Sequence, residues 1–114
     1  MKDILMNTLL FDFYGELLTE HQKQIYEDYV LNDLSLGEIA STYGISRQGV
    51  HDLIKRCDKA LCGYEEKLHL LEKFMNAKKS FEKMNRLLKE YRETGNEELF
   101  EEIESLSDNI LDEM

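Results

Sequence analysis

The chain has 114 residues, a formal net charge of −10 at pH 7, 33% charged residues and no proline. This length permits one modest core, and the abundance of Leu, Glu, Lys and Asp indicates a soluble, nearly all-helical protein and leaves little room for β-structure. No apolar run approaches the ~18 residues of a membrane span, and the stretch ILMNTLLFDFY lacks signal-peptide features, so we expect a cytoplasmic protein without membrane insertion.

The N-terminal part of the chain predicts two helices. Apolar residues are dense from Ile4 to Tyr14, and Gly15 then permits a bend. Thr19, followed three residues later by Gln22, is a capping-box pattern at the start of a second helix. That helix runs through EHQKQIYEDYVL and is expected to end at residues 32–33.

The next stretch, SLGEIASTYGISRQGVHDLIKRC, predicts a helix-turn-helix made of two short helices. Ser35 caps the first helix with Glu38 at the capping-box position, and Ser46 caps the second. Gly44 supplies the left-handed residue of a tight turn, and Ala40 is small where the helices must approach. The apolar residues expected on the inner side of the crossing are Ile39, Ile45, Val50 and Leu53.

The C-terminal half predicts a helical hairpin. A helix from Tyr64 to about Glu93 would be about 45 Å long. Its seam consists of Leu70, Phe74, Ala77, Phe81, Met84, Leu88 and Tyr91. Gly95 ends this helix, and a shorter one follows with a matching seam of Leu99, Ile103, Leu106 and Ile110.

The shorter helix of the hairpin can cover only part of the longer one, so the rest of the seam must meet the N-terminal domain or a second copy of the chain. We favour the second copy and expect a homodimer. The predicted organisation is a helix-turn-helix domain over residues 1–63 and an interaction hairpin over residues 64–114.

Six residues of the helix that begins after Ser46 are candidate nucleic-acid contacts. Arg47 and Gln48, at the start of the helix, can reach base edges or phosphates. The basic side chains further along the helix can contact the phosphate backbone. Residues 46–60 hold four basic and two acidic side chains, a local charge of +2. The predicted set is Arg47, Gln48, His51, Lys55, Arg56 and Lys59.

Two features oppose nucleic-acid binding and keep a protein-docking use of the same scaffold open. Asp52 is expected to point outward and would repel phosphate, and a pI near 4.7 is the opposite of what a duplex-binding protein usually shows. No catalytic constellation is present, and Cys57 and Cys62 with three scattered histidines lack zinc-site or disulfide spacing. We therefore predict no enzyme, no cofactor and no metal.

Two resemblances extend this interpretation. The segment LTEHQKQIYEDYVLNDLSLGEIASTYGISRQGVHDLIKRCDKAL resembles region 4 of bacterial sigma factors. The blocks LLFDFYGELLTEHQ, DLSLGEIA, SRQGV and YEEKLHL, which occur in this order between Leu9 and Phe74, are similar to the YlxM family of small bacterial helix-turn-helix proteins. The resemblance implies an all-α fold in which a sigma-region-4-like helix-turn-helix bundle precedes the long helix and the C-terminal hairpin.

The resemblance also implies partners. In sigma factors the start of the recognition helix contacts promoter DNA, and the matching positions here are Arg47, Gln48, His51 and Asp52. The YlxM family is linked to the signal recognition particle, because genes for the particle's protein and its receptor tend to neighbour those of the family. We therefore expect a non-enzymatic accessory protein that binds signal recognition particle RNA or its protein components. A DNA-binding transcriptional regulator and a pure protein-interaction module are the alternatives.

Overall fold

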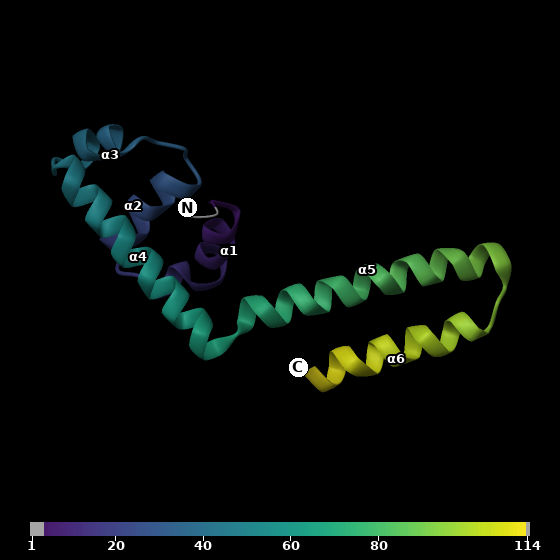
Figure 1. Ribbon diagram of the computed structural model, residues 1–114. Helices are drawn as coiled ribbons and strands as arrows, with labels where there is room; N and C mark the ends of the chain where they lie inside the picture. Colours follow the sequence, from purple (N-terminus) through teal and green to yellow (C-terminus); the bar gives the residue numbers. More distant parts are fainter. Residues whose placement is uncertain (1–3, 114) are drawn as a thin grey trace. The chain divides into compact units, whose positions relative to one another are not determined.

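A computed structural model describes residues 4–113, and every regular element in this part of the chain is helical (Figure 1). The predicted all-α class is confirmed. The helices are α1 (Ile4–Tyr14), the short 3-10 helix η1 (Gly15–Leu17), α2 (Glu20–Val30), α3 (Leu36–Tyr43), α4 (Arg47–Leu68), α5 (Leu70–Thr94) and α6 (Glu98–Glu113). The chain divides into two compact units after Leu71.

Helix α4 is the centre of the N-terminal unit, because it packs against α1, α2 and α3 (Figure 1). Its inner side buries Val50, Ile54, Cys57 and Leu61. The other three helices contribute the buried side chains Leu10, Phe11, Tyr14, Ile25, Tyr26, Ile39 and Ala40. One contiguous core therefore holds the helix-turn-helix formed by α3 and α4 against the first two helices.

The predicted caps are present in the structure. The hydroxyl of Ser35 accepts from the Glu38 N–H while the Glu38 carboxylate accepts from the Ser35 N–H, and Thr19 and Gln22 form the same reciprocal pair. Gly44 closes α3 with φ of 67°, in the left-handed region that favours glycine. These local contacts confirm the expected starts of α2 and α3 and the turn between α3 and α4.

The second helix of the helix-turn-helix is longer than predicted. We expected a short helix followed by a boundary near Gly63, but α4 continues through Gly63 to Leu68 and spans 22 residues. Glycine weakens a helix interior by only about 0.5–1 kcal/mol relative to alanine. Burial of Cys57 and Leu61 just before it outweighs that cost.

The long helix also begins later than the predicted Tyr64. Helix α4 stops at Leu68, His69 takes a left-handed conformation with φ of 55°, and α5 starts at Leu70. Contacts from distant residues hold this break. The Tyr14 hydroxyl donates to the Glu65 carboxylate and accepts from the Leu70 N–H at 3.2 Å. The same carboxylate accepts from the Leu71 N–H at 3.0 Å, so the first N–H groups of α5 are capped from α1 and α4.

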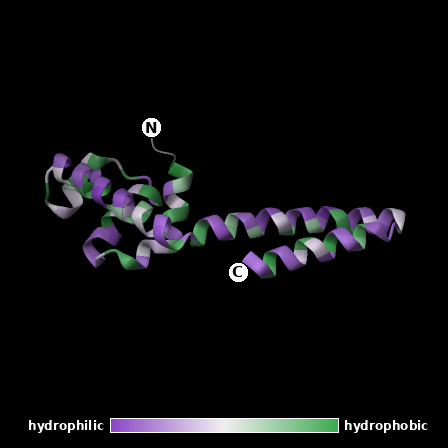
Figure 2. Ribbon diagram, turned by 60° about the horizontal axis from the view of Figure 1, so that its bottom comes forward, coloured by the Kyte–Doolittle hydropathy of each residue, from purple (hydrophilic) through white to green (hydrophobic). Residues whose placement is uncertain are grey.

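The C-terminal unit is an antiparallel hairpin of α5 and α6, which lie side by side in both views (Figures 1 and 2). Gly95, with φ of 69°, ends α5 as predicted. The seam of α6 matches the expectation, since Leu99 and Ile110 are buried and Ile103 and Leu106 are half-buried. On α5 the centre of the contact is shifted: Leu87 is buried, whereas the predicted seam residues Phe74, Phe81 and Leu88 are exposed.

None of the helices in residues 4–113 combines the length and the apolar character that crossing a membrane requires.

Candidate nucleic-acid interface

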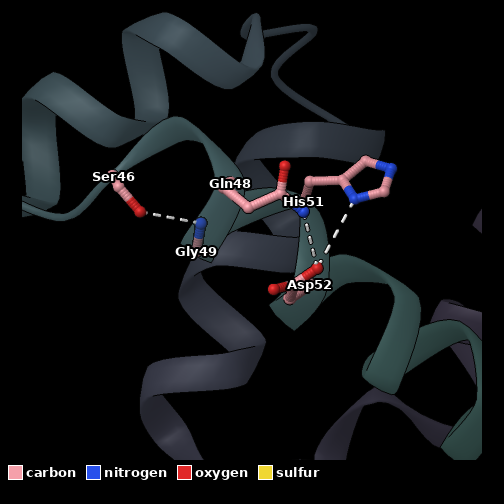
Figure 3. Close-up of polar contacts among 5 residues, drawn as sticks. All are labelled: Ser46, Gln48, Gly49, His51 and Asp52. Atoms are coloured by element: carbon pink, nitrogen blue, oxygen red, sulfur yellow. Dashed lines mark hydrogen bonds and ion pairs between the residues drawn. The ribbon is translucent and has the colours of Figure 1, made fainter.

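The start of α4 is set by local contacts that leave its outer side free. The Ser46 hydroxyl accepts from the Gly49 N–H at 2.9 Å and caps the helix (Figure 3). A Cβ on Gly49 would lie 3.1 Å from that hydroxyl oxygen, so glycine suits the close approach. The helix thereby begins at Arg47 with its first side chains at the surface.

The predicted contact residues are accessible. Arg47, Gln48, Lys55, Arg56 and Lys59 are exposed, and the His51 side chain is 44% exposed. At about 100° per residue, all except Arg56 fall on one side of the helix, and Arg56 lies at its edge. We call this side the recognition face, and it consists of Arg47, Gln48, His51, Lys55 and Lys59.

Two shallow grooves follow the recognition face. The first, of about 500 Å³, is lined by Leu36 of α3 together with Arg47, Gln48 and His51. The second, of about 460 Å³, is lined by Lys55, Asp58, Lys59 and Cys62 further along α4. The structure thus brings five of the six predicted residues together in two neighbouring sets, and Arg56 lines neither groove.

Asp52 is engaged by its neighbours on the recognition face. The Gln48 amide donates to the Asp52 carboxylate at 3.0 Å (Figure 3). His51 Nδ1 lies 3.7 Å from the same carboxylate oxygen, a pairing that carries charge only when the imidazole is protonated. A ligand phosphate at this point would meet Asp52 as a repulsive charge, partly offset by the Gln48 donor.

The second acidic residue of the region, Asp58, is mostly buried where it lines the second groove. Asp58 is 7% exposed, and its carboxylate accepts a hydrogen bond from the buried Tyr26 hydroxyl of α2. The exposed side chains of residues 46–60 therefore include four basic residues and the single acidic residue Asp52.

Cys57 lies below the recognition face and contributes packing instead of thiol chemistry. It is fully buried against the N-terminal core, and burial raises the pKa of its thiol to about 11. Thiol nucleophiles need an accessible thiolate near neutral pH. Cys57 therefore serves as a small residue of the core.

Comparison with known proteins places this helix-turn-helix chain in a family. Residues 1–108 match the family model described as "UPF0122: Putative helix-turn-helix protein, YlxM / p13 like". The chain belongs to the UPF0122 family. The YlxM-like resemblance inferred from the quoted blocks is thereby confirmed, and it extends over almost the whole chain.

Individual UPF0122 proteins are similar over most of their length. One from Caldanaerobacter subterraneus subsp. tengcongensis is 54% identical over 82 residues, which cover 72% of this chain and 70% of that protein. One from a Thermoanaerobacter species is 42% identical over 92% of this chain and 97% of its own length. A Bacillus cereus protein is 46% identical over 85% of this chain and 87% of its own length.

Two residues that line the grooves of this candidate interface were not among the residues predicted from the sequence. Leu36 forms one wall of the first groove, and its position directly after the Ser35 cap was the available signal. Asp58 entered only the charge count of residues 46–60, although its spacing of four from Ile54 and three from Leu61 places it beside the inward-facing residues. Its partner Tyr26 lies 32 residues away and has no local signal.

Proposed function

We propose that this UPF0122 protein is a non-enzymatic accessory protein that binds nucleic acid through the recognition face of α4. The observation that carries the proposal is the exposure of Arg47, Lys55 and Lys59 on one side of a helix whose second acid, Asp58, is mostly buried and accepts a hydrogen bond from Tyr26. Arg56 at the edge supplies a further phosphate contact. Cationic side chains in such a row suit a phosphate backbone.

Structured RNA fits the charge of this chain better than duplex DNA does. The recognition face is small, and the whole chain carries −10, which weakens attraction to a long duplex. Folded RNA is recognised through shape, phosphates and 2′-hydroxyls more than through base edges in a major groove. Asp52 at the start of α4 disfavours close approach to a phosphate there but can accept a hydrogen bond from a hydroxyl or a base amino group.

We propose a signal recognition particle component as the target, with its RNA ahead of its protein components. The support is the membership in a YlxM-like family, for which this link is implied by gene neighbourhood. The proposed working form is a homodimer, in which two recognition faces act together.

A DNA-binding transcriptional regulator is the competing function, favoured by the helix-turn-helix description of the family. It requires two recognition helices about one duplex turn apart, as a two-fold dimer provides. A pure protein-interaction module is the third option, and it makes the basic residues of α4 irrelevant to binding.

A fluorescence anisotropy titration tests these functions. Labelled signal recognition particle RNA and a random DNA duplex are titrated at two salt concentrations with the wild-type chain and with Arg47→Ala/Lys55→Ala. We expect RNA binding that weakens with salt, and we expect the double variant to bind at least about tenfold more weakly with a salt slope lower by about 1 to 2.

The matched control is Lys79→Ala/Lys83→Ala, which removes the same charge from exposed positions of α5. Equal losses in both double variants would indicate a general charge effect and contradict the assignment to α4. Tighter binding to the duplex would favour the regulator. No binding to either nucleic acid at micromolar protein and low salt would leave the protein-interaction module.

A further inference from the structure

The C-terminal unit buries very little of its apolar surface. Among residues 72–113, only Leu87, Leu99 and Ile110 are buried. Units of about 40 residues seldom hold together on so small a core without a disulfide, a metal or another chain. Neither cysteine lies in this unit, since Cys57 and Cys62 both belong to α4. The hairpin therefore needs an additional apolar surface to cover it.

The apolar side chains of the hairpin that are largely exposed form two rows. On α5, Phe74, Phe81 and Leu88 follow one another at intervals of seven residues and are 48%, 53% and 41% exposed. On α6, Leu111 is 68% exposed, and Phe100 is 43% exposed although its ring packs on that of Tyr91 with 4.3 Å between the centroids. Hydrophobic segments recur along both helices in Figure 2. Rows at intervals of seven or eleven residues return to nearly the same side of a helix.

Both rows lie on the same side of the hairpin. On α5 the row is rotated by about 80°, at about 100° per residue, from Ala77, Met84, Leu87 and Tyr91, which are buried or half-buried and face α6. On α6 the row is rotated by about 100° in the same sense from the residues that face α5. Because the two helices run antiparallel, equal rotations carry both rows to one side. We call it the hairpin face, and it consists of Phe74, Phe81, Leu88, Phe100 and Leu111.

The opposite charges of α5 and α6 favour a second copy of the hairpin as the surface that covers this face. Helix α5 carries seven basic and four acidic side chains, a net charge of +3, whereas α6 carries seven acidic side chains and no basic one. A second hairpin is therefore complementary to the first if each α5 lies over the partner's α6. Pairing like helices would instead place two strongly acidic helices together.

We propose that two copies of the chain stack their hairpin faces into an antiparallel four-helix bundle in which α5 of each copy packs against the partner's α6. The two-fold axis then runs parallel to the helices, and every neighbouring pair is antiparallel. The outer edge of the row on α5 carries Lys78 and Lys89, and that on α6 carries Glu104 and Asp108, all exposed. These four side chains meet across the two copies.

This inference deepens the homodimer of the proposed function by naming its surface, and it is tested without nucleic acid. Sedimentation equilibrium of the full chain from ~1 to ~200 µM is expected to show a dimer. We expect Phe74→Ser/Phe81→Ser to raise the dimer dissociation constant at least ~100-fold. The control Leu17→Ser/Leu31→Ser alters two exposed leucines of the N-terminal unit and should leave it unchanged.

Charge exchange tests the arrangement of the two copies. Lys78→Glu/Lys89→Glu makes both helices acidic along the outer edge, and Glu104→Lys/Asp108→Lys makes both helices basic there. Each variant alone is therefore expected to have a dimer dissociation constant at least ~10-fold higher than the wild type. An equimolar mixture of the two variants should restore a 1:1 dimer, because each edge again pairs opposite charges. Circular dichroism of each variant checks that the helices are retained.

Three results would overturn the proposal. The first is a wild-type chain that stays monomeric up to ~200 µM, because its dimer dissociation constant would then lie well above that concentration. The second is a Phe74→Ser/Phe81→Ser chain that dimerises as tightly as the wild type. The third is a mixture of helical charge variants that stays monomeric. Loss of nucleic-acid binding by Arg47→Ala/Lys55→Ala bears on α4 alone and leaves these outcomes unaffected.

Discussion

Tyr26 and Asp58 form the polar contact on which the inner side of α4 depends. The Tyr26 side chain is fully buried, its hydroxyl donates to the Asp58 carboxylate, and its ring stacks 5.5 Å from that of Phe11. Burial, with smaller contributions from nearby groups that include Cys57, raises the pKa of the Tyr26 phenol above its usual value. A buried carboxylate without its donor would be costly, so this pair ties α2 to α4.

Replacing Tyr26 by Phe is expected to lower the free energy of unfolding by about 1–3 kcal/mol at pH 8, because Asp58 loses a buried hydrogen-bond donor. Urea denaturation followed by circular dichroism measures this change. Tyr29→Phe, at a half-buried position of the same helix, is the matched control and should change stability much less. Equal losses in both variants would show that the Tyr26–Asp58 hydrogen bond contributes little.

The raised pKa of Tyr26 also predicts how stability depends on alkaline pH. The unfolded chain releases the phenol proton near pH 10. The folded chain keeps it to higher pH, so the contribution is complete below pH 10 and is lost as pH rises further. The Cys57 thiol, with a pKa raised to about 11, acts in the same direction. We expect Tyr26→Phe to lose stability less steeply than the wild type between pH 9 and pH 11, measured by the same denaturation.

At the scale of the elements, α4 owes its length to packing and not to its local residues. Gly63 lies inside the helix, where a Cβ would meet no atom within 4 Å. Gly44, at the end of α3, has φ of 67°, which side chains rarely adopt. The helix can therefore accept a side chain at position 63, whereas the turn at position 44 favours glycine. From the sequence, both glycines suggest the end of a helix.

Gly63→Ala is expected to raise the free energy of unfolding of the N-terminal unit by about 0.5–1 kcal/mol, because alanine loses less backbone entropy in a helix. Gly44→Ala should lower it by about 1 kcal/mol or more, because it strains the left-handed turn. Denaturant unfolding of both variants measures the sign of each change in the free energy of unfolding. A destabilising Gly63→Ala would mean that α4 needs flexibility at that point.

For the whole molecule, the two units differ in how they are stabilised. The N-terminal unit has a continuous core from α1 to α4, whereas the described part of the hairpin buries three side chains. Amides open locally where few apolar contacts protect them, and association stabilises a unit by mass action. The stability of the hairpin should therefore depend on protein concentration, and that of the N-terminal unit should not.

Hydrogen exchange followed by mass spectrometry tests this difference. At ~1 µM protein we expect the amides of α5 and α6 to exchange much faster than those of α4, and at ~100 µM we expect α5 and α6 to be slowed while α4 is unchanged. The Phe74→Ser/Phe81→Ser chain should lose the concentration dependence. Identical exchange of α6 at both concentrations in the wild-type chain would contradict a hairpin stabilised by self-association.

Local sequence patterns predicted the helical class, the starts of α2, α3 and α4, the turn at Gly44, the hairpin turn at Gly95 and the residues exposed on the recognition face. These features depend on residues within a turn or two of one another, through caps and helical periodicity. Tertiary contacts were needed to place the end of α4, to bury Asp58 and to leave Phe74, Phe81 and Leu88 of α5 exposed. Those outcomes depend on Tyr14, Tyr26 and α6, whose contacts join residues far apart in the chain.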